Sequence, residues 1–363
     1  MTERTIVDAA ARLRREHEPY LVATVASARG ATYRHPGARM LLTRFRWVAG
    51  AVSGGCLEGD IASTGWSATR NGEAVLLTYD AGGAHDDDVR SAFGLGCEGV
   101  VEVLVERSGL PGRIDALEVA GRCLRGQQRG AVATVFRAAD PALRIGTRAA
   151  LIEGRELEAE QMPDALRDAI ARDLADALAT GVTTTTTHDG VEVLVEAIVP
   201  PPRLFVLGAG HDAVPVATLA RHLGWDVVVC APQAKFSMRD RFAAVADEIL
   251  VGTTAEILQR IEESARALAI VMSHDHERDR DLLAALLDSR VRYIGMLGPA
   301  ARTQRMLAAL GRAPDPRVHA PVGLTPQEVA LAIVTGAQAA TAHPAVVVQV
   351  PDPAPGPVLS AVG

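Results

Sequence analysis

The sequence predicts an α/β protein of two domains, an N-terminal α+β domain and a C-terminal domain built on a parallel sheet. From Leu204 onward, apolar strand-like segments alternate with helical segments, and this alternation is typical of a parallel sheet. The first of these strands leads into a glycine-rich loop at residues 208–213 that opens a helix. The length of 363 residues is sufficient for two domains that each bury a core.

Residues 1–107 are predicted to form the N-terminal domain. We expect helices where apolar residues recur with helical spacing, and strands where apolar and β-branched residues gather. These patterns predict helices at 6–15 and 57–70, and strands at 20–27, 40–43, 74–79 and 100–105.

Residues 108–200 are interpreted as a connector that completes the sheet of the N-terminal domain. The turn-forming run His188-Asp189-Gly190 predicts a hairpin between strands at 183–187 and 190–195. Further elements are expected as helices at 113–124 and 162–179 and a strand at 131–137. Three consecutive prolines at 200–202 then provide a stiff junction.

The C-terminal domain is expected over residues 201–340. Its pattern predicts strands at 204–207, 226–230, 248–251, 268–272 and 292–296, and helices at 212–223, 239–244, 255–264, 277–288, 299–310 and 326–337. Residues 341–363 are a proline-rich tail without periodicity, for which we expect no packed core.

Composition excludes several classes of protein. The net charge is −7, aromatic residues make up 4%, and there is no long basic run, which argues against a nucleic-acid partner. Without an apolar run near the ~20 residues that span a bilayer, or the apolar region of a signal peptide, we expect a cytoplasmic protein with no membrane partner. The four cysteines form no CxxC pair, so we expect no metal site.

Residues 50–60 are the most informative segment of the chain. They combine four glycines with Cys56 and the acids Glu58 and Asp60. Glycine allows a close approach of the backbone to a ligand, the cysteine offers a soft sulfur, and the acids accept hydrogen bonds or protons. We therefore predict a ligand site here, while a glycine turn with a buried cysteine is the simpler alternative.

Two further segments flank this loop in the sequence, Thr32–Met40 (TYRHPGARM) and Phe93–Gly99 (FGLGCEG). Together the three segments resemble the N-terminal domain of the xanthine dehydrogenase accessory family, XdhC/CoxI. The sequence from about residue 204 resembles that family's C-terminal Rossmann domain. The resemblance therefore implies an XdhC/CoxI-type domain followed by a Rossmann-like domain.

The same resemblance implies a function. A member of this family would be a maturation factor, a chaperone that binds the molybdenum cofactor as cargo and protects it while its terminal sulfur ligand is installed. It would then deliver the cofactor to a molybdoenzyme apoprotein of the xanthine dehydrogenase or CO dehydrogenase type. A cysteine desulfurase is a further expected partner, and a homodimer is the expected assembly.

The resemblance also assigns roles to residues. Soft thiolates prefer soft metals, so Cys56 or Cys97 would lie near molybdenum or relay sulfur. Glycine loops at Gly208–Gly210 and at Ser53, Gly54 and Gly55 would cradle the phosphate of the cofactor. Arg34 and Arg39 would pair with that phosphate through their guanidinium groups, unless both are solvated surface charges.

The loop at 208–213 has the form G-x-G-x-x-A, with Gly208, Gly210 and His211 among its residues. Its amides and the following helix would favour an anion, unless the domain has lost its ligand. The acid that usually holds the ribose is missing, since Ala231-Pro232-Gln233 stands where family members commonly have Asp-Pro-Arg. Because Lys235 lies just beyond, with Arg239 and Arg241 after it, we expect NADP in preference to NAD if either nucleotide binds.

A polar cluster at 273–279 follows a buried-looking strand. His274 and His276 would ligate a metal, donate a proton or hold a ligand oxygen, and in the simpler alternative Asp275 caps the next helix. We expect His274 to face a ligand. We also expect the Cys56 and Gly208 loops to line one cleft, because ligand sites favour domain interfaces.

Two other functions remain open alongside the chaperone. An NADP-dependent oxidoreductase would hold its nucleotide on the C-terminal domain and a small-molecule substrate at the Cys56 loop, with His274 or Glu58 as proton donor. An assembly scaffold without a bound small molecule is the third class. The sequence therefore leaves open whether the chain is an enzyme.

Overall fold

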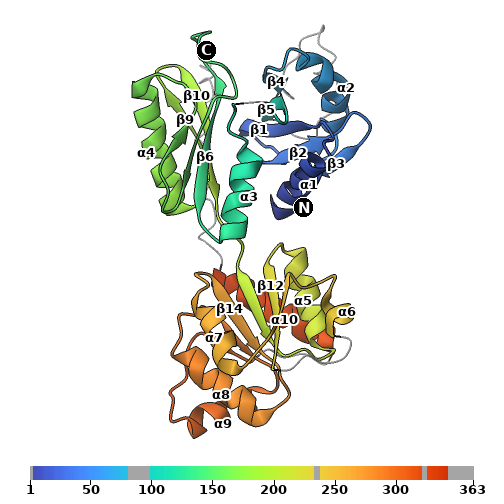
Figure 1. The fold of residues 1–363 in the computed structure, drawn as a ribbon, viewed down its shortest axis with the longest axis vertical. Coiled ribbons are helices and arrows are strands. Elements are labelled where there is room, and N and C mark those ends of the chain that lie inside the picture. The colour runs from blue at the N-terminus through green and yellow to red at the C-terminus, as the bar shows by residue number, and fades with distance from the viewer. Residues whose placement is uncertain (1–2, 81–98, 111, 233–237, 321–324, 342–363) are drawn as a thin grey trace, which may run out of the picture.

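The computed structural model describes residues 3–80, 99–110, 112–232, 238–320 and 325–341 (Figure 1). Within these residues the chain forms three sheets. Two antiparallel sheets of five strands each make up the N-terminal half, and a parallel sheet of six strands makes up the C-terminal half. The predicted α/β class, with a Rossmann-like C-terminal domain and an α+β domain before it, is confirmed. No described helix is long and apolar enough to span a bilayer.

The first sheet is centred on its longest strand, which pairs with neighbours on both sides. The strand order is β3 (Trp47–Gly50), β2 (Arg39–Leu42), β1 (Leu21–Gly30), β5 (Gly99–Arg107) and β4 (Val75–Asp80). Helix α2 (Glu58–Ala68) packs Ile61 against one face of this sheet. Helix α1 (Glu3–Arg15) has one apolar face, which includes Val7 and Leu13, and it buries that face between the sheet and α3 (Ala116–Gly126).

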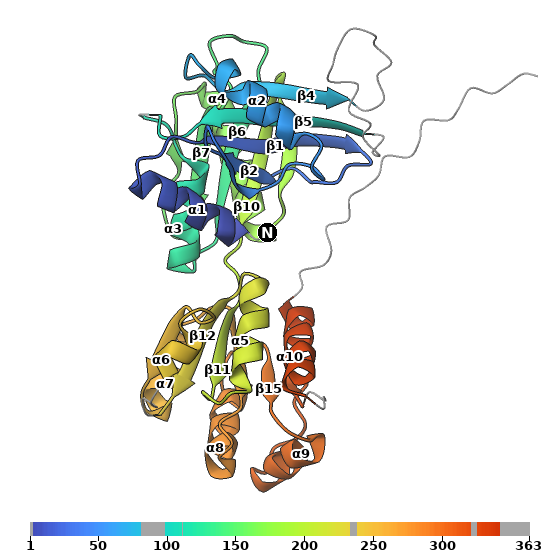
Figure 2. The same ribbon diagram turned by 90° about the vertical axis from the view of Figure 1, so that its right-hand side faces the viewer.

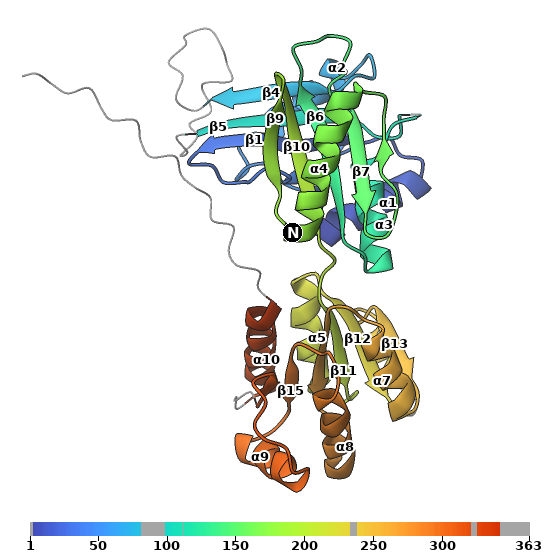
Figure 3. The same cartoon turned by 90° about the vertical axis from the view of Figure 1, so that its left-hand side faces the viewer.

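The segment after the first sheet does not complete it, and the connector interpretation is wrong on this point. The segment forms a separate second sheet in the order β8 (Glu158–Ala159), β7 (Arg148–Ile152), β6 (Gly130–Arg137), β10 (Val191–Ile198) and β9 (Thr184–His188). The reason is that β6 is buried on both faces: Val135 faces α4 (Asp164–Thr180), while Phe136 packs against Ala26 and Leu104 of the first sheet. The sheets therefore meet face to face, and α4 covers the outer face of the second one (Figure 3).

The hairpin predicted in this segment is confirmed. Strands β9 and β10 pair from His188 opposite Val191, and the two turn residues, Asp189 and Gly190, have φ values of +46° and +79°. Positive φ at both positions is the requirement of the tight turn that matches the twist of paired strands.

The C-terminal domain has helices on both faces of its sheet. The strand order is β13 (Glu248–Val251), β12 (Asp226–Ala231), β11 (Arg203–Leu207), β14 (Ala267–Val271), β15 (Ile294–Met296) and β16 (Val318–His319). One face carries α5 (Ala213–His222), α6 (Met238–Phe242) and α10 (Pro326–Thr341), and the other carries α7 (Thr254–Glu262), α8 (His276–Leu287) and α9 (Ala300–Ala309). Burial on both faces explains why the central strands read as continuous apolar runs.

The two halves meet at the amino ends of the parallel strands (Figure 2). Arg4 of α1 pairs with Asp247, which precedes β13, and Gln127 donates a hydrogen bond to Asp226 at the start of β12 (3.4 Å). The Gly208 loop follows the carboxyl end of β11 and so lies at the far end of its domain. The expected cleft lined by both the Cys56 loop and the Gly208 loop is therefore wrong for a single chain.

Gly50 is the position at which the N-terminal domain least tolerates a side chain. Its φ is +75°, and a Cβ atom would lie 2.0 Å from the carbonyl oxygen of Arg39. We predict that Gly50→Ala lowers the free energy of unfolding by about 2 kcal/mol or more. At Gly59, in α2, nothing lies within 4 Å of an added Cβ atom, so Gly59→Ala should change the free energy of unfolding by less than about 1 kcal/mol. Urea unfolding measures both, and equal effects would contradict the prediction.

Candidate functional site

The Cys56 loop, residues 53–57, joins β3 to α2 and is organised by a buried carboxylate. Glu58 Oε1 accepts hydrogen bonds from the backbone N–H groups of Val52 (3.0 Å) and Ser53 (2.8 Å), and Oε2 accepts one from the Ser53 hydroxyl. Burial acts to raise the pKa of Glu58, but these hydrogen bonds outweigh it and hold the pKa below the ordinary value. Glu58 thus orders the loop as a carboxylate.

The Ser53 hydroxyl fixes further backbone groups of the loop by accepting hydrogen bonds. It accepts hydrogen bonds from the backbone N–H groups of Gly55 (3.0 Å) and Leu57 (3.2 Å), and the Cys56 thiol lies 3.5 Å from it. Cys56 itself is exposed. The loop therefore presents a thiol to solvent from a backbone that is fixed on its buried side.

Tyr33 brings the segment before β2 against this loop. A Cβ atom on Gly54 would lie 3.7 Å from atoms of the Tyr33 ring, and that ring is largely exposed. Arg34, the next residue, is also exposed. The structure thus brings together two of the segments that the sequence singles out, and it adds an aromatic ring to the predicted set.

A cavity of about 240 Å³, here called the Glu196 cavity, lies beside these segments. Arg39 of β2 donates to Glu196 Oε2 of β10 at 2.6 Å, and both side chains are buried. The expectation for Arg39 is corrected accordingly: its guanidinium pairs with a carboxylate of the other sheet and is not a solvated surface charge. The lining consists of Glu3, Ile6, Arg34, Pro36, Gly37, Ala38, Arg39, Gly50, Ala51, Leu117, Thr183, Glu196 and Ala197.

Sequence reasoning missed Glu196, although the sequence holds a signal for it. The side chain is a carboxylate within an otherwise apolar strand end, Val193–Ile198. Burial raises the pKa of Glu196, while Arg39 acts to lower it. A charged group at a buried position requires a partner of opposite charge. A glutamate in this apolar strand end therefore predicts a second buried charge.

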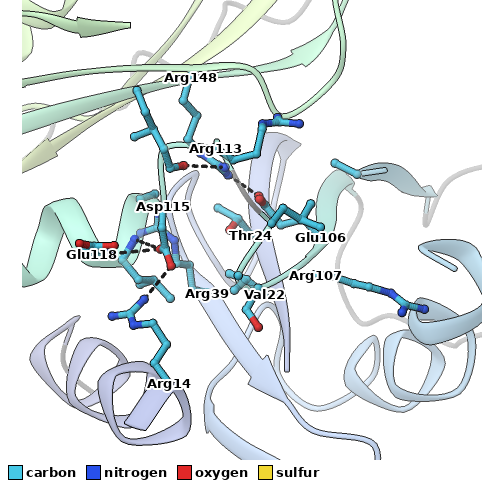
Figure 4. A pocket seen from close by; sticks show the side chains of 17 residues that line it. Arg14, Val22, Thr24, Arg39, Glu106, Arg107, Arg113, Asp115, Glu118 and Arg148 are labelled. Carbon is cyan, nitrogen blue, oxygen red and sulfur yellow. Dashed lines mark hydrogen bonds and ion pairs between the residues drawn. The ribbon is translucent and has the colours of Figure 1, made fainter. Parts of the chain in front are cut away.

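A second cavity, of about 190 Å³, lies between the two sheets (Figure 4). Several of its charged side chains form ion pairs. Arg14 pairs with Asp115 at 2.6 Å, and Arg148 pairs with Glu106. Asp115 also caps α3 by accepting from the backbone N–H of Leu117 (2.8 Å). Ion pairs around this cavity join the two sheets, and Arg39 and Leu117 are the lining residues that it shares with the Glu196 cavity.

The carboxyl ends of β11 and β14 form a separate group of candidate residues. A Cβ atom on Gly208 would lie 2.2 Å from the carbonyl oxygen of Met272, so glycine lets the two loops touch. His274 Nε2 lies 2.8 Å from Asp212 Oδ2, which ties the β14 loop to the start of α5. His274 has a φ of +62° and is largely exposed, so its ring is available to a ligand.

Other residues at this edge have defined positions. Asp275 caps α8 by accepting from two backbone N–H groups, which confirms the capping alternative for that residue. His211 is exposed at the Gly210 loop, and Arg241 donates to the carbonyl oxygen of Ala209 (2.8 Å). Cys97 and Lys235 lie outside the described residues.

Fold and site together define a class of protein: a Rossmann-like domain joined to a two-sheet domain that carries an exposed thiol on a glycine loop. Comparison with known families agrees. The model of the "XdhC and CoxI family" matches residues 13–80, and that of the "XdhC Rossmann domain" matches residues 204–336. The chain belongs to the XdhC/CoxI family.

Individual proteins show the same likeness. A Bacillus subtilis (strain 168) protein, named as a probable subunit of xanthine dehydrogenase, is 28% identical over 335 residues, which cover 91% of this chain and 94% of that protein. "Uncharacterized protein YqeB" of Escherichia coli (strain K12) is 30% identical over 146 residues, 36% of this chain and 26% of that one. A crystal structure of a xanthine dehydrogenase from Bacillus halodurans shares the fold, with a TM-score of 0.72, 24% identity, and coverage of 93% and 94% of the two chains.

The three described cysteines should differ sharply in reactivity. Burial raises the pKa of Cys123 to about 11 and that of Cys230 to about 12, whereas Cys56 is exposed. Because the thiolate is the reactive form, we predict that a maleimide at neutral pH labels Cys56 at least about 100-fold faster than either. Peptide mass spectrometry of the folded Cys97→Ser protein measures the rates, and labelling of Cys123 at the rate of Cys56 would contradict the prediction.

Proposed function

We propose that this protein is a xanthine dehydrogenase accessory factor that binds the molybdenum cofactor and delivers it, in sulfurated form, to a molybdoenzyme of the xanthine dehydrogenase or CO dehydrogenase type. Membership of the XdhC/CoxI family supports the accessory role, and the name of the Bacillus subtilis relative supports an association with xanthine dehydrogenase. The observation that carries the proposal is the exposed Cys56 thiol, held on a loop that Ser53 and Glu58 fix from the buried side.

The chemistry of the exposed groups fits this cargo. A soft sulfur ligand suits molybdenum and its sulfur ligands, and the cofactor brings that metal chemistry with it. Arg34 offers a guanidinium for the phosphate of the cofactor, and the Tyr33 ring offers a flat surface for its pterin. We propose a cysteine desulfurase as the source of sulfur, a homodimer as the assembly, and the cytoplasm as the location.

The Cys56 thiol can be tested by measuring bound cofactor. We predict near-stoichiometric pterin in protein purified without oxygen from a host that makes the cofactor, and at least about 10-fold less in Cys56→Ser, because the hydroxyl is a poor ligand for a soft metal. Ser67→Ala, at an exposed position of α2, is the control and should keep its pterin. Fluorescence of the oxidised pterin gives the content. Full loading of Cys56→Ser would rule out the thiol as a ligand.

A second candidate function rests on the other group of residues. The His274–Asp212 pair lies between the β11 and β14 loops, where the strand order of the sheet reverses. Open α/β sheets bind ligands at such a point, and an oxidoreductase would place its nicotinamide nucleotide there. His274 would then be the proton donor, since its ring is exposed.

This candidate requires a preference for NADPH. No acid stands between the end of β12 at Ala231 and Arg239 to hold the ribose hydroxyls, while Arg241 lies against the glycine loop. We predict that NADPH binds at least about 10-fold more tightly than NADH if the domain binds nucleotide. Titration of nicotinamide fluorescence measures both affinities. Equal affinities, or no binding of either, would contradict this candidate and leave the cofactor-carrier proposal unaffected.

A further inference from the structure

The Glu196 cavity lies next to the Cys56 loop along two stretches of chain. Ala51 lines the cavity, and the Cys56 loop begins two residues later at Ser53. Arg34 lines the cavity, and Tyr33, the residue before it, packs on Gly54 of the loop. A ligand seated in the cavity would therefore have the thiol loop as its neighbour.

The buried carboxylate of Glu196 uses only one of its oxygens. Oε2 accepts from Arg39, but no hydrogen bond or ion pair reaches Oε1 from the residues that the structure describes. A Cβ atom on Gly37 would lie 3.1 Å from Oε1 and would cover it, and the φ of +91° at Gly37 favours glycine there. The structure thus leaves an acceptor oxygen open at the side where Gly37 carries no side chain.

An acceptor oxygen without a partner in this position favours a ligand that donates a hydrogen bond to it. A buried polar atom that loses its water and gains no partner costs about 1–3 kcal/mol. The lining holds two guanidinium groups, Arg34 and Arg39, and two carboxyl groups, Glu3 and Glu196, so the donor need not be a cation. Apolar side chains of the lining, Ile6, Pro36 and Leu117, suit the body of a small flat ring.

We propose that the Glu196 cavity binds the aminopyrimidine edge of a pterin, with Glu196 Oε1 accepting a hydrogen bond from the exocyclic amino group. The inference rests on the proposed function, because it assigns the pterin part of that cargo to Glu196, a residue that neither the sequence patterns nor the family resemblance suggested. Guanine carries the same edge, so the chemistry is shared by two sources and the experiment must separate them.

The test uses free ligands that differ in one group. Pterin carries an amino group where lumazine, a pteridine of the same shape, carries a carbonyl oxygen. Fluorescence titrations of the full chain with pterin, lumazine and guanosine give the affinities. We expect pterin to bind at least about 10-fold more tightly than lumazine, because a carbonyl facing Glu196 Oε1 leaves two acceptors in contact. Guanosine binding as tightly as pterin would assign the site to a purine and overturn the pterin assignment.

Matched variants locate the effect. In Glu196→Gln the preference for pterin over lumazine should fall to near one, since the side chain now offers a donor as well as an acceptor. Glu192→Gln is the control: Glu192 lies on the same strand and pairs with Arg137, but it does not line the cavity, and the preference should persist. If Glu196→Gln fails to fold, Ala51→Leu, which adds volume to the lining without altering the ion pair, should weaken binding of pterin at least about 10-fold.

The outcomes separate this inference from the proposed function. Equal affinity for pterin and lumazine in the unaltered protein, or an unchanged preference in Glu196→Gln, would overturn the cavity assignment even if the purified protein carries cofactor. A preference that depends on Glu196 in a protein that never acquires molybdenum cofactor would uphold the cavity and overturn the cofactor-carrier function instead.

Discussion

The N-terminal half depends on charges buried between its two sheets. Each sheet supplies one partner of each pair, so the pairs fix which face of one sheet meets which face of the other. Removing one partner of a buried pair typically costs about 3–5 kcal/mol, because it leaves a charge without compensation. The buried pairs are Arg39 with Glu196 and Arg148 with Glu106, and a third pair across the sheets joins the buried Glu102 to the half-exposed Arg137. The same constraint builds the candidate site, since Glu196 is held at its cavity by the pair that joins β2 to β10.

Most of the C-terminal domain could be predicted from the sequence, because its signals are local. Strands buried on both faces read as continuous apolar runs, and helix starts carry caps such as the Thr253–Glu256 capping box before α7. The arrangement of the N-terminal half could not be predicted in the same way. Arg39 and Glu196 are 157 positions apart in the sequence, and no local pattern shows that such residues meet. Short strands such as β3 and β7 were missed because four or five residues give little periodicity.

The candidate site shows the same difference between local signals, which the sequence contains, and contacts between distant residues, which it does not reveal. The position of the Cys56 loop could be predicted from its unusual composition, whereas the function of Glu58 could not, since its partners include backbone N–H groups that any residue supplies. His274 could be singled out by its neighbours in the chain, but its partner Asp212 lies 62 positions away. The sequence therefore predicted candidate segments and left open which side chains in them would act on a ligand.

The contact between Arg4 and Asp247 has a consequence for the order in which the molecule is completed. Arg4 leaves the ribosome 243 positions before Asp247. At about 5–20 residues per second, synthesis separates the two by roughly 10 to 50 s. Helix α1 therefore has time to pack against the first sheet before Asp247 is synthesised. Asp247 also accepts hydrogen bonds from Arg221 and from the Val227 backbone N–H, both of which are synthesised before it, so this contact between the halves cannot form until Asp247 has been made.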